Sequence, residues 1–510
     1  MKVLLILPAG ENVRVTPERP RVPKRAMLRF SVLPLTTVAA LTPPEHEVRI
    51  VDENVEPLDF DCDCDVVGVT FMTALAPRAY DIAREFQARG RIVVAGGYHA
   101  TLCPEEAALH FDAIVVGDAE DAWERVLVDI ESGRLCCSGG SASRRGSPDS
   151  CDSALQRSTA TPARIYRSLN NSLELHAPIP RRDLLERTAR HYVTVNAVQA
   201  GRGCRHHCRY CSVTVFHGHQ YRHRSASDVL AELQTIPRNF IFVDDNIAAD
   251  RDYAWELFQA MTPLRKRWVS QCSIEIADDP ELLRLMHAAG CCGLFIGIET
   301  TSAENLAAMG KQFNHSGQYA QRLAAIRRAG IGIVAGIIVG MDGDDVGVFE
   351  RTLRFLRRTQ IDAIQLNILT PLPGTPLYAD MECAGRVTDC DWSHYDYRHV
   401  VFQPARMSAR QLQAGADWLY AQFYRLDRIL WRFARGVFTV GMMPSLLALK
   451  LGLTYRYDNR RENIIGWNPA RSRRLSGYLL RLRQSSSPLN AAPRTPSIAL
   501  ASQSDGTYSN

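Results

Sequence analysis

Residues 201–211 read Gly-Arg-Gly-Cys-Arg-His-His-Cys-Arg-Tyr-Cys and place Cys204, Cys208 and Cys211 in one short loop. The loop follows the apolar run Tyr192–Val198, which predicts a buried strand. Spacings of three and two residues allow three thiolates from a single loop to bind one metal cluster. Three thiolates fill three iron positions of a [4Fe–4S] cluster and leave the fourth iron open, and an open position distinguishes a catalytic metal site from a structural one.

Two other metal sites are compatible with the same spacing. A zinc ion would recruit His206 or His207 as its fourth ligand, and a structural iron–sulfur cluster would take a fourth cysteine such as Cys272 or Cys291. The position of the loop favours the catalytic alternative, because enzymes built on parallel barrels keep their chemistry at the carboxyl ends of the strands.

Strands alternate with helices from residue 191 onward. The expected strands after the loop are Phe240–Val243, Trp268–Ile274, Gly293–Ile298, Ile333–Val339 and Ala363–Leu369. The expected helices between them are Ala226–Thr235, Pro280–Ala289, Ala303–Met309 and Tyr319–Ala329. Six strand–helix units predict a partial or full barrel of parallel strands.

The amino-terminal part predicts a different α/β arrangement. Its short apolar runs are Val3–Leu7, Val48–Val51, Val66–Phe71, Arg91–Ala95 and Ala113–Val116. Runs that are apolar on both faces and alternate with helical segments such as Ala79–Ala88 predict a doubly wound parallel sheet. Gly96-Gly97 and Gly117-Asp118 directly follow two of these strands, at the edge where such sheets bind ligands. The alternative is that these glycines only form tight turns.

These patterns divide the chain into five parts. We expect a doubly wound domain over 1–135, a flexible linker and connector over 136–190, a barrel over 191–404, a helical region over 405–483 and a disordered tail over 484–510. The fold class is therefore α/β with a helical carboxyl-terminal region.

The amino-acid composition excludes several classes of protein. The 510 residues are 46% hydrophobic and 23% charged, which excludes a wholly disordered chain, a collagen and a small disulfide scaffold. A net charge of +5 gives little support for nucleic-acid binding. We find neither a signal peptide nor an apolar run long enough to span a membrane, so we expect a cytoplasmic protein with reduced thiols.

The cysteine loop resembles the signature of the radical S-adenosylmethionine (SAM) superfamily, and Tyr210 matches the aromatic residue that commonly precedes the third cysteine. In that family the open iron chelates SAM, and the reduced cluster cleaves it to methionine and a 5′-deoxyadenosyl radical. The resemblance implies that Cys204, Cys208 and Cys211 bind the cluster. It further implies SAM contacts by residues at three later strand ends: Asp244, Asp245, Glu299, Gly336 and Gly340. The glycines of the family's Gly-Gly-Glu strand end are absent before Asp244.

The amino-terminal sheet resembles the cobalamin-binding domain that precedes many radical SAM barrels, and the segment Pro371–Tyr378 is similar to the same class. This resemblance implies cobalamin contacts by five residues at strand ends: Thr70, Gly96, Gly97, Gly117 and Asp118. The D-x-H-x-x-G motif that supplies a histidine to the lower face of the cobalt is missing, and His99 is a poor substitute by its spacing.

The relatives that this chain resembles, such as the hopanoid C-2 methylases, imply methylation of an unactivated carbon of a small or hydrophobic metabolite, with reducing electrons from a donor such as flavodoxin or ferredoxin. A second hypothesis keeps the cofactors but performs cyclisation or rearrangement. A third is an RNA methylthiotransferase, and a fourth is a non-catalytic Fe–S protein. For the third, Cys62, Cys64 and Cys103 have the wrong spacing, and the carboxyl-terminal part is expected to be helical.

Overall fold

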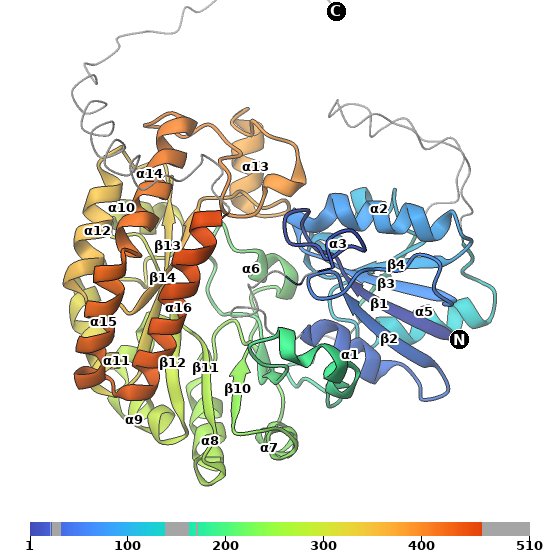
Figure 1. Cartoon of the computed structure of the whole chain (residues 1–510), viewed down its shortest axis with the longest axis horizontal. Coiled ribbons are helices and arrows are strands. Elements are labelled where there is room, and N and C mark those ends of the chain that lie inside the picture. Colours follow the sequence, from blue (N-terminus) through green and yellow to red (C-terminus); the bar gives the residue numbers. More distant parts are fainter. Residues whose placement is uncertain (21, 23–31, 138–162, 170–171, 462–510) are drawn as a thin grey trace, which may run out of the picture. The chain divides into compact units, whose positions relative to one another are not determined.

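Two parallel sheets organise the computed structural model, which describes residues 1–20, 22, 32–137, 163–169 and 172–461 (Figure 1). Both sheets belong to one unit of the chain, Met1–Trp467. The expected disordered tail over 484–510 and most of the expected flexible linker, residues 138–162, lie outside the described residues. No helix in the described parts of the chain is both long and apolar enough to cross a membrane.

The first sheet has the order β2-β1-β3-β4-β5-β6, and all its pairs are parallel. Its strands are β1 (Lys2–Leu7), β2 (Glu47–Asp52), β3 (Val66–Thr70), β4 (Ile92–Gly96), β5 (Ala113–Val116) and β6 (Arg164–Arg167). Its helices are α1 (Leu33–Leu41), α2 (Ala76–Gln87), α3 (Tyr98–Leu102), α4 (Pro104–Ala107) and α5 (Ala122–Glu131). The five expected strands are confirmed, whereas the edge strand β6 lies in a segment that we expected only to connect domains.

Alternate residues of these strands point to opposite faces, and each face has its own apolar core. Leu4 and Ile6 of β1 pack with residues of α2 on one face. Val3 and Leu5 of the same strand pack with residues of α1 and α5 on the other face, where Trp123 is part of the core. Helices therefore cover both faces, as a doubly wound sheet requires.

The second sheet has the order β14-β13-β12-β11-β10-β7 and is also entirely parallel. Its strands are β7 (Ala197–Val198), β10 (Asn239–Phe242), β11 (Arg267–Cys272), β12 (Cys291–Glu299), β13 (Gly332–Val339) and β14 (Ala363–Ile368). The helices that alternate with them are α7 (Ala226–Thr235), α8 (Arg251–Met261), α9 (Pro280–Ala288), α10 (Ala303–Ala308), α11 (Tyr319–Arg328) and α12 (Val348–Arg358). The expected partial barrel of six strands is confirmed. The expected first strand, Tyr192–Val198, is wrong in extent, because only its last two residues pair.

Short elements complete the barrel and its carboxyl-terminal side. An antiparallel ribbon of β8 (Gly201–Arg202) and β9 (Arg222–His223) encloses α6 (Ser212–His217), and α13 (Pro376–Cys383) follows β14. The expected helical region consists of α14 (Ala409–Phe423), α15 (Leu426–Thr439) and α16 (Met442–Arg461), and α15 and α16 run side by side in Figure 1.

Candidate active site

The cysteine loop leaves the carboxyl end of the first barrel strand and is fixed by backbone contacts on three sides. The amide of Arg209 donates to the carbonyl of Met309 (3.0 Å), and the carbonyl of Arg209 accepts from the amide of Leu377 (3.1 Å). Gly203 has φ of +86°, and a Cβ there would lie 2.2 Å from the carbonyl oxygen of Gln220. Only glycine therefore lets the loop close against the segment that follows α6.

The three thiols face a common, partly buried space. Burial raises the pKa values of Cys204, Cys208 and Cys211, the last to about 11. The charge of Cys204 acts on Cys208, and that of Cys208 acts on Cys211, in the same direction. A positive iron–sulfur core would remove this mutual repulsion of the thiolates.

Asp244 and Asp245 lie beneath the loop at the end of β10. The carboxylate of Asp244 is fully buried and accepts from the amides of Ala200 (3.1 Å) and Gly201 (2.5 Å). Asp245 accepts from the amide of Gly203 (2.9 Å). Asp244 therefore holds the beginning of the loop, and Asp245 reaches closer to the cysteines, because its charge acts on both Cys204 and Cys211.

Glu299 ends β12 in a strained conformation and carries a buried ion pair. Its φ is +63°, and the pairing of β12 with β13 shifts register between Gly297 and Glu299. Its carboxylate lies 2.6 Å from Nζ of Lys311, which also donates to the hydroxyl of Tyr210 (3.3 Å). A Cβ on Gly297 would lie 2.5 Å from the Glu299 carboxylate, so the glycine makes room for the pair. Such strained backbone concentrates at functional sites.

Lys311 brings a positive charge to the thiols. Burial disfavours its charged form, yet Glu299 and Cys208 raise its pKa. Sequence reasoning missed this residue. The sequence offered one signal for it: Lys311 is one of only five lysines in the chain. The contact of nearby Met309 with the loop is visible only in the structure.

The glycines of β13 serve packing and turning. A Cβ on Gly336 would lie 2.9 Å from the ring of Phe295 on β12. Gly340 has φ of +99° and donates its amide to Asp344 (2.9 Å). Both positions shape the strand end that was expected to contact SAM, and the lack of a side chain leaves the backbone accessible to a close neighbour.

The expected cobalamin residues lie along one edge of the first sheet. Gly97 has φ of +93°, and a Cβ there would lie 2.6 Å from Oγ1 of Thr70 and 3.1 Å from the amide nitrogen of Phe71. Gly96 ends β4, and Gly117 (φ +84°) follows β5 and donates to Oγ1 of Thr101 (3.0 Å). Gly97 thus lets the backbone after β4 approach the end of β3 closely, and Thr70, Gly96, Gly97 and Gly117 together form a ledge at the carboxyl ends of β3, β4 and β5.

Asp118 points away from this ledge and links the two sheets. It forms ion pairs with Arg202 (3.0 Å) and Arg222 (2.5 Å), which come from the β8–β9 ribbon of the barrel, and these arginines keep its pKa low although burial opposes this. Arg202 also pairs with Glu120 (2.6 Å). The structure thus gives Asp118 a role in joining the sheets.

Tyr98 begins α3 directly after the glycine turn and connects the ledge with the cysteine loop. Its ring lies 4.8 Å from that of Phe216 on α6, measured between ring centroids. Burial raises its pKa well above the usual value, and the charges of Asp245, Cys211 and Tyr397 act in the same direction. Tyr397 has φ of +65°, and burial and Cys211 raise its pKa to about 12. The charge of Cys211 thus acts on both tyrosines, and Tyr98 reaches the helix that follows Cys211 through its contact with Phe216.

Both ring nitrogens of His99 have hydrogen-bond partners within the amino-terminal domain. It is fully buried, and its Nε2 lies 2.9 Å from the hydroxyl of Tyr80 and 2.9 Å from the carboxylate of Glu106. Its Nδ1 lies 3.2 Å from Oγ1 of Thr73. An imidazole held on both nitrogens is a poor axial ligand, which agrees with the expectation from its spacing.

The residues needed for the other metal sites have separate surroundings. The ring of His206 stacks on Phe313 at 3.6 Å, and the ring of His207 contacts that of His219 at 4.0 Å. Cys272 is buried at the end of β11, and Cys291 begins β12 at the opposite end of the sheet. Burial and, to a smaller extent, the charge of Cys204 raise the pKa of Cys272. Among the described residues, the three loop cysteines included, no three His, Cys, Asp or Glu side chains are arranged to hold a single metal ion.

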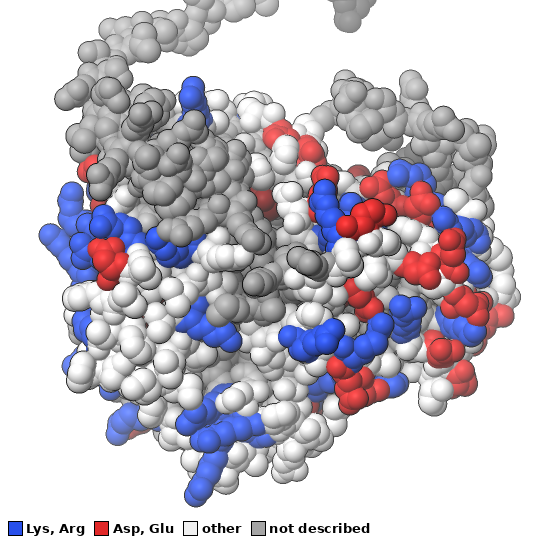
Figure 2. All heavy atoms as spheres, viewed as in Figure 1, with Lys and Arg blue, Asp and Glu red and all other residues white. Residues whose placement is uncertain are grey.

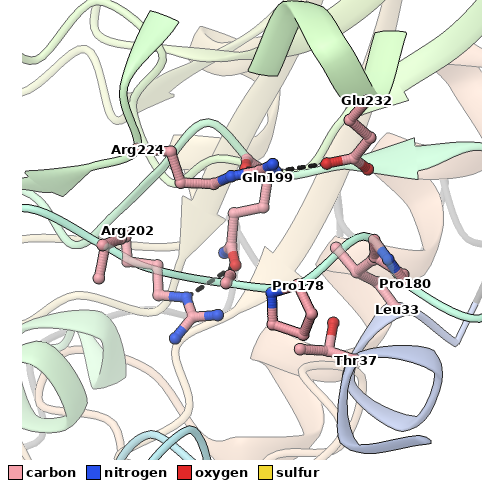
Figure 3. A pocket seen from close by; sticks show the side chains of 10 residues that line it. Leu33, Thr37, Pro178, Pro180, Gln199, Arg202, Arg224 and Glu232 are labelled. Carbon is pink, nitrogen blue, oxygen red and sulfur yellow. Dashed lines mark hydrogen bonds and ion pairs between the residues drawn. The ribbon is translucent and has the colours of Figure 1, made fainter. Parts of the chain in front are cut away.

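A small polar cavity lies beside the loop, lined by residues that include Leu33, Pro178, Gln199, Arg202 and Arg224 (Figure 3). Its volume of about 20 Å³ suffices for one water molecule. Figure 3 shows Arg202 hydrogen-bonded to Gln199 (2.8 Å) and Arg224 paired with the buried Glu232. This network fixes the strand end from which the loop departs.

Comparisons with known proteins identify both halves of this site. Residues 198–356 match the radical SAM superfamily, and residues 29–127 match the B12 binding domain. The chain is 28% identical over 410 residues to bacteriochlorophyllide d C-12(1)-methyltransferase of Chlorobaculum tepidum, covering 78% of this chain and 84% of the relative. It is 28% identical over 372 residues to hopanoid C-2 methylase of Rhodopseudomonas palustris, and the match covers 70% of this chain and 65% of that relative.

A solved structure agrees in fold. The radical SAM methyltransferase TsrM of Kitasatospora setae, with cobalamin and a [4Fe–4S] cluster bound, superimposes with a TM-score of 0.56 at 16% identity, over 95% of this chain and 99% of the other. The chain thus combines a radical SAM domain with a B12 binding domain, and the cofactors of these domains are a [4Fe–4S] cluster, SAM and cobalamin. The two relatives named above are a methyltransferase and a methylase.

Proposed function

We propose that the junction between the two sheets is the active site of a methyltransferase acting on an unactivated carbon. The supporting observation is the contact of Tyr98, which follows the glycine turn of the first sheet, with Phe216 on α6, the helix that begins directly after Cys211 of the barrel loop. The ligand-binding edges of the two sheets therefore face the same small region, as a reaction that needs both cofactors requires.

We assign a set of residues to each of the three cofactors. We assign the three irons of the cluster to Cys204, Cys208 and Cys211. SAM would lie between the open iron and the strand ends that carry Asp245, Glu299, Gly336 and Gly340, with Asp244 holding the loop from below. Cobalamin would lie on the ledge formed by Thr70, Gly96, Gly97 and Gly117, with Asp118 fixing that ledge to the barrel.

When bound, these groups supply a 5′-deoxyadenosyl radical and a methyl group. The protein supplies position and a water-poor environment. Tyr98 and Tyr397 line the space beside Cys211, and burial keeps both phenols neutral. Lys311 balances negative charge at the thiols while Glu299 holds Lys311 in place.

We further propose a hydrophobic metabolite as the substrate, because the two curated relatives are named for a bacteriochlorophyllide and a hopanoid. Each turnover consumes two SAM molecules and two electrons, and we expect a flavodoxin or ferredoxin in the cytoplasm to deliver the electrons. The RNA-modifying alternative needs a carboxyl-terminal β-barrel, whereas residues 409–461 form the helices α14, α15 and α16.

The products distinguish methylation from cyclisation or rearrangement. After anaerobic reconstitution with iron, sulfide and hydroxocobalamin, bacteriochlorophyllide d and a hopanoid are offered with SAM and a reductant. We expect 5′-deoxyadenosine and S-adenosylhomocysteine in about equal amounts with the true substrate, because one SAM gives the radical and the other restores the methyl group. Turnover that yields 5′-deoxyadenosine without S-adenosylhomocysteine would show the alternative chemistry.

Bound cobalamin should lack a histidine on its lower face, since D-x-H-x-x-G is missing and His99 is occupied by Tyr80 and Glu106. The measurement is electron spin resonance of the reduced cobalt(II) form. We expect no nitrogen splitting from a protein imidazole, and the His99→Ala variant should give the same spectrum as the wild type. A nitrogen splitting that disappears in that variant would contradict the assignment.

A further inference from the structure

The helices α12, α14 and α15 enclose an arginine-lined cavity that the reaction does not use. The cavity has a volume of about 90 Å³ and lies between α12, α14 and α15, with Arg357, Arg428, Arg432 and Arg435 in its wall. Since one water needs about 10–15 Å³, the cavity has room for a small anion. It lies on the outer helices, apart from the cysteine loop (Figure 1).

Two of these arginines have donors without partners. The Nε atoms of Arg432 and Arg435 are buried and make no hydrogen bond within the described residues. Arg432 donates through Nη1 to the carbonyl of Phe423 (3.0 Å), and its guanidinium lies 4.0 Å from the centre of the Phe423 ring. Buried donors are normally satisfied, so two unsatisfied guanidinium nitrogens beside one cavity point to a missing acceptor.

The cavity is strongly positive. No carboxylate lies within ion-pair distance of Arg357, Arg432 or Arg435 in the described parts of the chain, and Asp427 pairs with Arg425 and Arg428 at the rim. Burial lowers the pKa of Arg432 to about 10, and Arg435 and Arg428 act in the same direction while Asp362 opposes them. An anion entering the cavity would remove this repulsion.

An exposed apolar face adjoins the cavity. Trp431 lines the cavity and is 53% exposed, and the guanidinium of Arg435 lies 4.3 Å from its ring centre. Phe438, two turns further along α15, is 88% exposed. The α15 face is thus formed by Trp431 and Phe438 beside the arginines of the cavity. Figure 2 shows blue side chains over one end of α15 and a mostly white area over the adjoining parts of α15 and α16.

The α15–α16 hairpin is rigidly packed beneath this face. A Cβ on Gly436 would lie 2.7 Å from Oγ of Ser445, and a Cβ on Gly452 would lie 3.3 Å from the side chain of Ile429. Ile429 and Gly436 of α15 therefore face α16, whereas Trp431 and Phe438, each two residues further along, lie on the side of α15 that is turned away from α16.

We propose that the face of α15 that carries Trp431 and Phe438 docks on a bilayer that contains anionic phospholipids and that the arginine cavity receives a lipid phosphate. Charge complementarity carries the proposal: arginines without carboxylate partners stand beside exposed Trp and Phe side chains, and amphipathic helices that lie in the membrane interface combine these two features. The proposal does not depend on methyl transfer, and its test measures no catalysis.

The test is co-sedimentation of the full-length protein with vesicles of phosphatidylcholine alone or of equal parts phosphatidylcholine and phosphatidylglycerol. We expect binding to the anionic vesicles only. The Arg357→Gln/Arg428→Gln variant should bind about 30-fold more weakly, since each basic residue near an anionic surface contributes about fivefold. The matched control, Arg84→Gln/Arg251→Gln, removes the same charge from exposed arginines elsewhere and should bind as the wild type does.

The apolar face is tested separately. Phe438→Ser should weaken vesicle binding several-fold, whereas Leu173→Ser, at a residue that is 62% exposed in the connector, should not. Thermal unfolding verifies that each variant is folded. Equal binding to both vesicle types, or unchanged binding in the arginine and Phe438 variants, would overturn the proposal. So would stabilisation by inorganic phosphate without vesicle binding, or a dimer in sedimentation velocity that Phe438→Ser dissociates in place of vesicle binding.

Discussion

We expect the Cys204→Ala/Cys208→Ala/Cys211→Ala variant to lose the iron–sulfur absorbance near about 400 nm and to cleave no SAM above background, because each thiolate is a required ligand. Reconstituted protein is compared with the wild type by absorbance, iron content and release of 5′-deoxyadenosine. Cobalamin binding should remain, because the ledge of Gly96, Gly97 and Gly117 belongs to the first sheet.

A matched control removes three other thiols. Cys136, Cys383 and Cys390 are exposed and lie outside the loop, so their triple alanine variant should keep both the cluster and SAM cleavage. A full complement of iron in the loop variant would refute the assignment of the ligands. Loss of iron in the control variant would show that the cluster uses thiols elsewhere in the chain.

Replacing Lys311 by methionine should destabilise the barrel by about 3–5 kcal/mol, because it leaves the buried carboxylate of Glu299 without its partner. The double variant Lys311→Met/Glu299→Gln removes both charges and should recover most of that free energy of unfolding. Urea denaturation of the cluster-free, reduced proteins provides the measurement, with Lys266→Met, at a partly exposed lysine, as the control.

SAM cleavage should separate the two roles of the pair. The double variant regains stability, but the positive charge beside Cys208 is still missing, so we expect its SAM cleavage to stay at least tenfold below that of the wild type, equivalent to about 1.4 kcal/mol. Wild-type stability of Lys311→Met would argue against a buried pair. Full SAM cleavage in the double variant would restrict Lys311 to a structural role.

Sequence reasoning succeeds where the information is local. The helix Ala226–Thr235 was predicted with both ends correct, and the structure shows why: the hydroxyl of Ser225 accepts from the amide of Asp228 and caps the helix. The cysteine spacing is local in the same sense, because all three thiols come from one loop. The strands of both sheets are mostly apolar over their length, which distinguishes buried parallel strands without any knowledge of their neighbours.

Prediction from the sequence fails where contacts with residues far away in the chain determine the local structure. The run from Tyr192 looks like a longer strand, but the hydroxyl of Tyr192 donates to Asp52 (2.8 Å) in the other sheet and only Ala197–Val198 pair. The strand β6 is too short and polar to recognise before its partner β5 is known. The role of Lys311 depends on the irregular pairing of β12 between Gly297 and Glu299. This irregularity turns Glu299 toward Lys311, which lies twelve residues further along the chain.

The ion pairs of Asp118 with Arg202 and Arg222 bear on how such proteins can be recombined. All three side chains are about nine-tenths buried, so a cobalamin domain without the aspartate would leave Arg222 in a dry interface without a counter-charge and Arg202 with Glu120 alone. A chimera that exchanges only the amino-terminal domain with that of a relative should therefore assemble poorly, unless the acidic residue after β5 is transplanted with it. Recombination of the two domains therefore has to keep the acidic residue of the first domain together with the two arginines of the barrel.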